Sequence, residues 1–220
     1  MSPFLLLINV SLTFCWTFLD IFIMITGIAI ATRFTQITER IRRMEKMMIP
    51  NSFWTEVRTH YLILNELVLY VDDRLSLLIL LSCASNLYFI CLQLLNSFTN
   101  NYTNTLSTVY FWFSLFFVMG RTVCVLLCAA SIHDSSKTPL KTLRNVPTRF
   151  WSVELGRFIY TITKDTIALS GRRFFYLTKR LVLAMAATVA TYELVVYDQV
   201  TSAERPPDSE THPCNWTHQE

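Results

Sequence analysis

Polar side chains recur at helical spacing inside three long apolar stretches of this sequence. In the stretch 3–32, Asn9, Thr13, Trp16 and Asp20 are four, three and four positions apart, which places them on one face of a helix. The other two stretches repeat the pattern, with Asn86, Gln93 and Ser97 in 75–98 and Tyr110, Ser114 and Arg121 in 106–133. Aromatic rings beside amides and a carboxylate suit a polyhydroxylated ligand, because its CH faces stack on the rings while its hydroxyls bond the polar groups. The alternative is that these side chains only hydrogen-bond neighbouring helices.

Sites for enzyme chemistry have no basis in the sequence. The four glycines are too far apart to form a phosphate-binding loop, and the six cysteines show neither zinc-ligand nor redox spacing. No cluster of His, Cys and carboxylate side chains occurs at reactive spacing. We therefore expect no enzyme activity, no catalytic residues, no cofactor, no metal site and no nucleic-acid partner.

The polar residues sit in a chain whose composition is that of a membrane protein. Hydrophobic residues make up 52% of the 220 residues and charged residues only 16%, against about a quarter charged in soluble domains. About 20 apolar residues span a bilayer as a helix, and four stretches are long enough: 3–32, 75–98, 106–133 and 174–200. The sequence predicts an all-α, polytopic transmembrane bundle of four spans.

The basic residues predict how the chain is threaded. The connection 33–74 holds seven of the 19 Lys and Arg residues, the segment 134–180 holds ten, and the link 99–105 holds none. Because basic residues near span ends stay in the cytosol, we expect 33–74 and 134–173 to be cytosolic. The link 99–105, the polar tail 201–220 and both chain ends would then be extracellular. The sequons at Asn101 and Asn215 fall on that outer side, although either can arise by chance.

The cytosolic connections are predicted to be largely helical. Arg33–Met48 and Phe53–Arg74 continue the first two spans as a long helical hairpin, and Ser135–Pro147, with its two prolines, is expected to be a loop. Apolar residues recur at helical spacing over Trp151–Leu169, which predicts an amphipathic helix ended by Ser170-Gly171. This helix would lie either on the membrane surface or in a cytosolic helical bundle.

Two charged residues lie deep inside predicted spans. Asp20 is about 17 residues from the outer end of its span and Arg121 about 15 from that of its own, so their depths agree within one helical turn. An isolated charge at such a depth costs at least about 2.5–3.5 kcal/mol. The two residues are therefore predicted to form an intramembrane ion pair.

The last span carries a stripe of small or polar residues at helical spacing: Ala184, Thr188, Thr191, Val195 and Asp198. Such a face either packs closely on another helix or lines a water-filled pore.

The same span carries a recognisable motif. The run 191–197, Thr-Tyr-Glu-Leu-Val-Val-Tyr, resembles the signature of insect gustatory receptors, in which a Thr-Tyr pair and five mostly apolar residues precede Gln-Phe. The Thr-Tyr-Glu form and the run Asp-Thr-Ile-Ala-Leu-Ser-Gly-Arg-Arg-Phe-Phe-Tyr-Leu-Thr at 165–178 are similar to the sugar-taste branch. So are Trp16, Asp20 and the runs 22–24 and 33–36, so that the resemblance covers nearly all of 4–197.

The resemblance implies a subunit of a sugar-gated, non-selective cation channel in the plasma membrane. Members have seven spans and form tetramers, so this chain would be a fragment holding the last four spans, in a homo- or hetero-tetramer surrounded by membrane lipid. The helix Trp151–Leu169 would belong to the cytosolic anchor. The sugar would bind in the outer half of the bundle, at Asn9, Thr13, Trp16, Asp20, Asn86, Gln93, Tyr110 and Ser114. The pore would be lined by Thr188, Thr191, Val195, Asp198 and Gln199.

The sequence departs from the signature at one place. Asp198-Gln199 stands where the family has Gln-Phe, and an Asp there would give a tetramer a ring of four carboxylates that favours cations. The alternative is that the sequence after Val196 is a gene-model or splicing artefact. The alternative function is a four-span membrane scaffold or accessory protein without ligand or conductance.

Overall fold

The computed structural model describes residues 3–44, 50–99, 105–147 and 151–204. The described chain is helical, with one isolated β-bridge between Ser170 and Tyr176. Its helices are α1 (Pro3–Met44), α2 (Asn51–Thr99), α3 (Thr105–Arg144), α4 (Val153–Lys164) and α5 (Lys179–Glu204). Both sequons and the tail beyond residue 204 lie outside the described residues.

Three helices of the described chain are long and apolar enough to cross a membrane. They are α1, the part Ser52–Leu95 of α2 and the part Thr108–Arg144 of α3. The protein is therefore an all-α, multi-pass membrane protein. The fourth predicted span, α5, is not one of these three helices.

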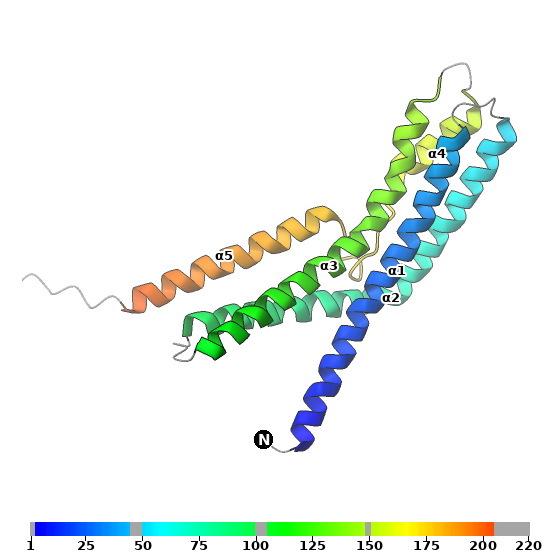
Figure 1. Cartoon of the computed structure of the whole chain (residues 1–220). Coiled ribbons are helices and arrows are strands. Elements are labelled where there is room, and N and C mark those ends of the chain that lie inside the picture. Colours follow the sequence, from blue (N-terminus) through cyan, green and yellow to red (C-terminus); the bar gives the residue numbers. More distant parts are fainter. Residues whose placement is uncertain (1–2, 45–49, 100–104, 148–150, 205–220) are drawn as a thin grey trace, which may run out of the picture.

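The three long helices lie together at one end and separate at the other (Figure 1). We call residues 21–44, 51–81, 122–146 and 153–178 the packed end, and residues 3–19 of α1, 87–99 of α2 and 105–120 of α3 the open end. At the open end α1 diverges from α2 and α3, while α5 runs beside α3 from the packed end outward (Figure 1).

The packed end is held by a core of large apolar side chains. The Tyr61 ring lies edge-on to Phe34 and Phe158, with centroids 5.4 Å and 5.3 Å apart, so α1, α2 and α4 meet there. Where α1 crosses α3, Gly27 removes the side chain: a Cβ at this position would lie 2.7 Å from the Cys128 carbonyl oxygen. Close approach of the two backbones accounts for α1 and α3 being the most extensively packed pair of helices.

The predicted loop Ser135–Pro147 is wrong, because α3 continues through Pro139 to Arg144. A proline inside a helix leaves the carbonyl four residues earlier without its N–H partner. Here Tyr61 Oη donates to the Ser136 carbonyl next to that break, at 3.1 Å, and Leu143 is completely buried in the core. Tertiary contacts therefore keep this segment helical in spite of its proline.

The predicted helix Trp151–Leu169 is also too long. α4 ends at Lys164, and Lys137 Nζ donates to the carbonyls of Ile162 (2.5 Å) and Asp165 (2.6 Å) at its C-terminus. Leu169 is buried but lies outside the helix.

Ser170-Gly171 is not a helix cap but the start of a tight hairpin that extends to Tyr176. The φ of Gly171 is not positive, and a Cβ at this position would meet the end of the Phe175 ring, so a larger residue here would require that ring to move. The last helix accordingly begins at Lys179, after the hairpin, rather than at 174.

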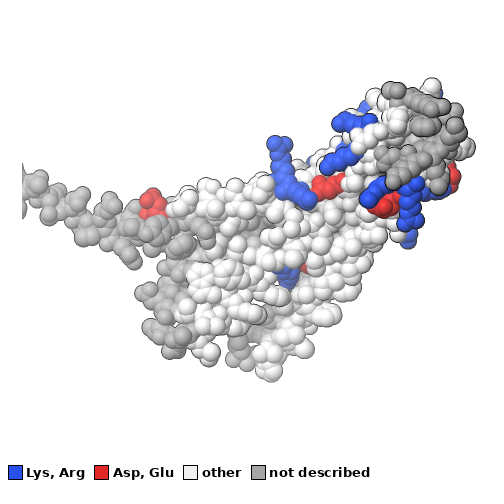
Figure 2. All heavy atoms as spheres, turned by 45° about the horizontal axis from the view of Figure 1, so that its top comes forward, with Lys and Arg blue, Asp and Glu red and all other residues white. Residues whose placement is uncertain are grey.

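Charge is distributed as unevenly as packing. Lys and Arg side chains gather over the packed end, whereas the rest of the visible surface is almost uncharged (Figure 2). Among the described residues, Arg121 is the only Lys or Arg outside the segments 33–74 and 134–180.

Candidate ligand-binding site

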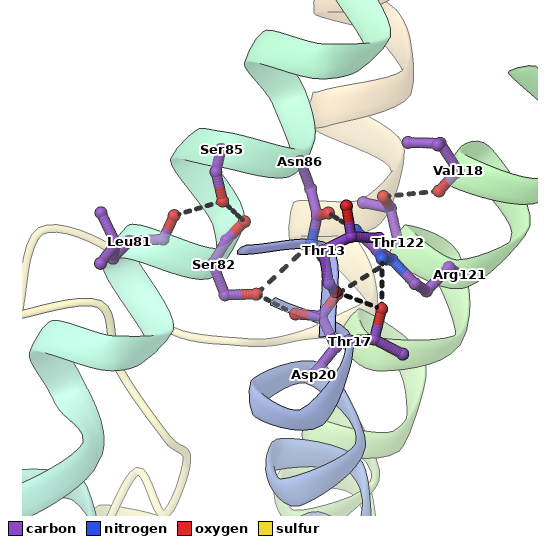
Figure 3. Close-up of polar contacts among 10 residues, drawn as sticks. All are labelled: Thr13, Thr17, Asp20, Leu81, Ser82, Ser85, Asn86, Val118, Arg121 and Thr122. Atoms are coloured by element: carbon purple, nitrogen blue, oxygen red, sulfur yellow. Dashed lines mark hydrogen bonds and ion pairs between the residues drawn. The ribbon is translucent and has the colours of Figure 1, made fainter. Parts of the chain in front are cut away.

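A buried polar cluster ties the three membrane-length helices together where the packed end meets the open end (Figure 3). Its centre is the carboxylate of Asp20 on α1, which is only 2% exposed. Ser82 Oγ donates to Asp20 Oδ1 at 2.5 Å, and Asn86 Nδ2 donates to Asp20 Oδ2 at 3.3 Å, both from α2. A buried carboxylate loses its hydrogen bonds to water, and donors from the protein must replace them to offset the free-energy cost of burial.

Arg121 on α3 supplies the opposite charge. Its Nε lies 3.0 Å from Asp20 Oδ2, its Nη2 donates to Asn86 Oδ1 at 2.7 Å, and its Nη1 donates to Thr17 Oγ1 at 3.4 Å. The structure thus contains the ion pair that the depths of Asp20 and Arg121 predict, and it adds Asn86 as a bridge between the two charges. Each atom of the Asn86 amide is engaged, so this side chain is fixed in orientation.

Gln93 and Ser114 form a second polar contact nearer the open end. Gln93 lies seven residues, or about 10 Å along the helix, beyond Asn86 on α2. Its Nε2 donates to Ser114 Oγ of α3 at 3.0 Å. Its Oε1 is buried and has no hydrogen-bond partner within the described part of the chain. A buried acceptor without a partner is costly, and it is the kind of group that a ligand hydroxyl would satisfy.

The predicted site residues of α1 line one side of the open end. Asn9 and Thr13 are exposed on α1, and Thr17, one turn after Thr13 on the same face, is half-buried. Trp16 is half-buried one turn before Asp20. Tyr110 on α3 is 73% exposed.

Sequence reasoning missed two members of the cluster, Thr17 and Ser82. Ser82 lies four residues before Asn86 and eleven before Gln93, so helical spacing alone would have placed it on the same face. Thr17 lies three residues before Asp20, a spacing that also gives one face.

Four of the predicted pore residues lie on a face of α5 that the rest of the described chain leaves uncovered. Thr188 and Thr191 are exposed and donate only to carbonyls of their own helix, at 3.0 Å and 2.9 Å. Val195 and Asp198 are exposed as well. The side chain of Gln199 lies outside the described residues.

Three membrane-length helices and a buried ion pair between them define a multi-pass membrane protein with a polar site between its spans. The profile of the trehalose receptor family matches residues 1–208. The chain belongs to this family, the sugar-taste branch of the insect gustatory receptors, which are receptors and not enzymes.

Three similar proteins of Drosophila melanogaster are gustatory receptors named for sugar taste or for trehalose. Gustatory receptor for sugar taste 64a is 47% identical over 192 residues, which are 87% of this chain and 42% of the relative. Gustatory receptor for sugar taste 64b is 44% identical over 91% of this chain and 49% of the relative. Gustatory receptor 5a for trehalose is 43% identical over 86% of this chain and 42% of the relative. The chain therefore spans less than half the length of each of these relatives.

Proposed function

We propose that this chain is the last four spans of a sugar-gated cation-channel subunit in the plasma membrane, with its sugar site at the open end. The family and the names of the relatives support a sugar as the ligand class. The observation that carries the proposal is the buried Oε1 of Gln93, which has no hydrogen-bond partner among the residues that the structure describes. It lies on the open-end side of a polar cluster that closes the space between α1, α2 and α3.

The cluster and the residues beyond it have different roles in this proposal. Asp20 and Asn86 already have their hydrogen-bonding groups engaged by Ser82, Arg121 and each other, so they form the floor of the site and fix its shape. Sugar hydroxyls would instead be bound by Gln93 and by Asn9 and Thr13, with Ser114 and Tyr110 on the α3 side. The Trp16 ring would stack on the CH face of the sugar.

The last helix, α5, would be the fourth span and the pore helix of a homo- or hetero-tetramer. Its face with Val182, Met185 and Val189 packs partly buried against α2 and α3. Its other face, with Thr188, Thr191 and Asp198, is exposed in the isolated chain. Four such faces around an axis would surround a pore, with the Asp198 carboxylates and Gln199 at its constriction favouring cations.

The charge distribution supports a cytosolic packed end and an extracellular open end. Both ends of this chain would then be outside the cell. In this topology α4, which the core of the packed end holds against α2 and α3, would be part of a cytosolic anchor between subunits.

The proposal is tested by expressing the full-length receptor that contains this chain in oocytes and applying a panel of sugars. We expect cation currents, and Gln93→Leu should raise the half-maximal sugar concentration at least about tenfold, because a sugar hydroxyl loses its acceptor. Gln36→Leu is the matched control, since Gln36 is an exposed glutamine at the packed end. Surface-labelled receptor that is silent with every sugar would contradict the proposal.

The pore assignment has its own readout. Asp198→Asn should reduce the permeability ratio of cations to anions and leave the half-maximal sugar concentration unchanged. An unchanged permeability ratio would remove Asp198 from the pore without affecting the sugar site.

A further inference from the structure

The hairpin between α4 and α5 carries two arginines in an unfavourable backbone conformation. Its strands are joined by Leu177 N–H donating to the Leu169 carbonyl at 2.8 Å, and its turn by Phe174 N–H donating to the Gly171 carbonyl at 3.0 Å. The two residues at the tip, Arg172 and Arg173, have φ of 54° and 63°. Turns with positive φ at both central residues favour Asn-Gly, because other side chains are strained there.

Contacts on both flanks place the hairpin where the spans end. On one side the Asp72 carboxylate accepts from Ser170 N–H (2.5 Å) and Ser170 Oγ (2.9 Å). On the other side Asp134 pairs with Lys179 at 2.7 Å. Asp72 lies three residues before the uncharged stretch 75–98, and Asp134 directly follows the apolar stretch 106–133. The tip is therefore fixed near the membrane boundary at the packed end.

The side chains at the tip are exposed and make no polar contact with the described part of the chain. Arg172 and Arg173 are exposed, and neither guanidinium has a hydrogen bond or ion pair with any residue that the structure describes. Phe174 beside them is 82% exposed. Arg180, the second residue of α5, is exposed as well. Two unpaired guanidiniums and an exposed aromatic ring at one boundary are explained neither by packing nor by the turn.

We propose that the hairpin tip is a binding site for the headgroup of an anionic phospholipid. Guanidinium groups bind phosphate in bidentate fashion, and an aromatic ring at the boundary inserts among the acyl chains. Phe174 is the reason for assigning a lipid rather than a soluble phosphate, which would leave the ring in water. The inference rests on the proposed topology in one respect: a cytosolic packed end places the tip at the cytosolic leaflet, which carries the anionic lipids.

The test separates the charge of the tip from its fold. The full chain is purified in neutral detergent, and phosphatidylserine or phosphatidylcholine is titrated in while bound lipid is counted by native mass spectrometry. The variant R172N/R173G removes both charges but supplies the residues that the turn prefers. We expect its affinity for phosphatidylserine to fall about 30-fold, corresponding to about 2 kcal/mol for two charges, while its melting temperature is unchanged or higher.

The matched control is R42Q/R43Q, which removes two adjacent exposed arginines from the far part of α1. It should bind phosphatidylserine as the unchanged chain does. F174S should weaken phosphatidylserine binding without removing the preference for the anionic lipid. The proposal is overturned if R172N/R173G binds phosphatidylserine normally, if phosphatidylcholine binds equally well, or if millimolar inorganic phosphate displaces the lipid. None of these readouts needs sugar or current, so they fail or succeed independently of the proposed channel function.

Discussion

The two ends of the bundle are built in opposite ways. At the packed end α1 buries a residue on almost every turn from Asp20 to Ile41, and the core there continues through α2, α3 and α4. At the open end residues 3–15 of α1 are all exposed, and the described core shrinks to Ile90, Leu94 and Leu115 of α2 and α3. The buried cluster around Asp20 lies at the border between these two regions.

The difference suggests that the packed end determines the stability of the bundle, whereas the open end binds the ligand. At the packed end the buried hydroxyls of Thr38, Tyr61 and Ser170 each donate to a carbonyl or carboxylate of the described chain. At the open end Asn9 and Thr13 are exposed, and the buried Oε1 of Gln93 has no hydrogen-bond partner in the described part of the chain. Substitutions at the border or in the packed end should therefore lower stability, and substitutions at the open end should change the response to ligand instead.

The largest effect is expected at the border. Arg121→Met leaves the Asp20 carboxylate buried and unpaired, which should lower the free energy of unfolding by about 3–5 kcal/mol. Neutralising both residues, in Asp20→Asn with Arg121→Met, should restore at least about 2 kcal/mol of this loss. The measurement is thermal stability of the purified chain in detergent, for both single variants and the double variant. Additive losses would show that the two charges do not stabilise each other.

A smaller effect is expected within the packed end, where α1 crosses α3. Gly27→Ala puts a methyl group 2.7 Å from the Cys128 carbonyl oxygen, which cannot move without shifting a helix backbone. The expected cost is about 1–3 kcal/mol, read as a lower melting temperature. Gly120→Ala is the matched control, because a Cβ there meets nothing within 4 Å and alanine favours the helix. Equal melting temperatures for the two variants would contradict the close crossing.

Removing the Tyr61 hydroxyl tests whether its hydrogen bond stabilises α3 around Pro139. Tyr61→Phe keeps the ring contacts with Phe34 and Phe158 but removes the hydrogen bond to the Ser136 carbonyl, so we expect a loss of about 1 kcal/mol. The control is Tyr70→Phe, because Tyr70 is 62% exposed and its ring contact with Arg74 does not need the hydroxyl.

The pH dependence gives a second readout for the same side chain. Burial, and secondarily the nearby charge of Asp165, raises the pKa of Tyr61 above its ordinary value of 10.0. The folded state thus favours the neutral phenol, and the stabilisation is present below pH 10 and is lost as the pH rises further. The unchanged chain should lose more stability than Tyr61→Phe between pH 9 and about pH 11. Parallel pH profiles would contradict the buried hydroxyl.

The sequence predicts positions along regular helices well. It predicts the local conformation wrongly where a contact with a residue distant in the chain determines that conformation. Depth counting along rigid helices predicted the contact of Asp20 with Arg121, because the rise per residue is constant. The loop expected at Ser135–Pro147 is helical because Tyr61, 75 residues earlier in the chain, bonds the Ser136 carbonyl. Ser170-Gly171 opens a hairpin rather than ending a helix because Asp72, 98 residues earlier, holds Ser170. Neither Tyr61 nor Asp72 can be identified from the spacing of residues within the segment that it contacts. The sugar contacts and the pore stay predictions.

The smallest effect on stability is expected at the open end, where the effect on ligand response should be clear. Thr13→Val keeps the size of the side chain and removes a hydroxyl that bonds only the Asn9 carbonyl of its own helix. The melting temperature should therefore change by less than the equivalent of about 0.5 kcal/mol. If Thr13 binds the sugar, the half-maximal sugar concentration of the full-length receptor should rise several-fold. Thr32→Val is the matched control: Thr32 is exposed and bonds only the Ile28 carbonyl of its own helix, at the packed end. A shift of equal size in both variants would mean that loss of such a hydroxyl acts through the helix, and the open end would then lose its distinct role in recognition.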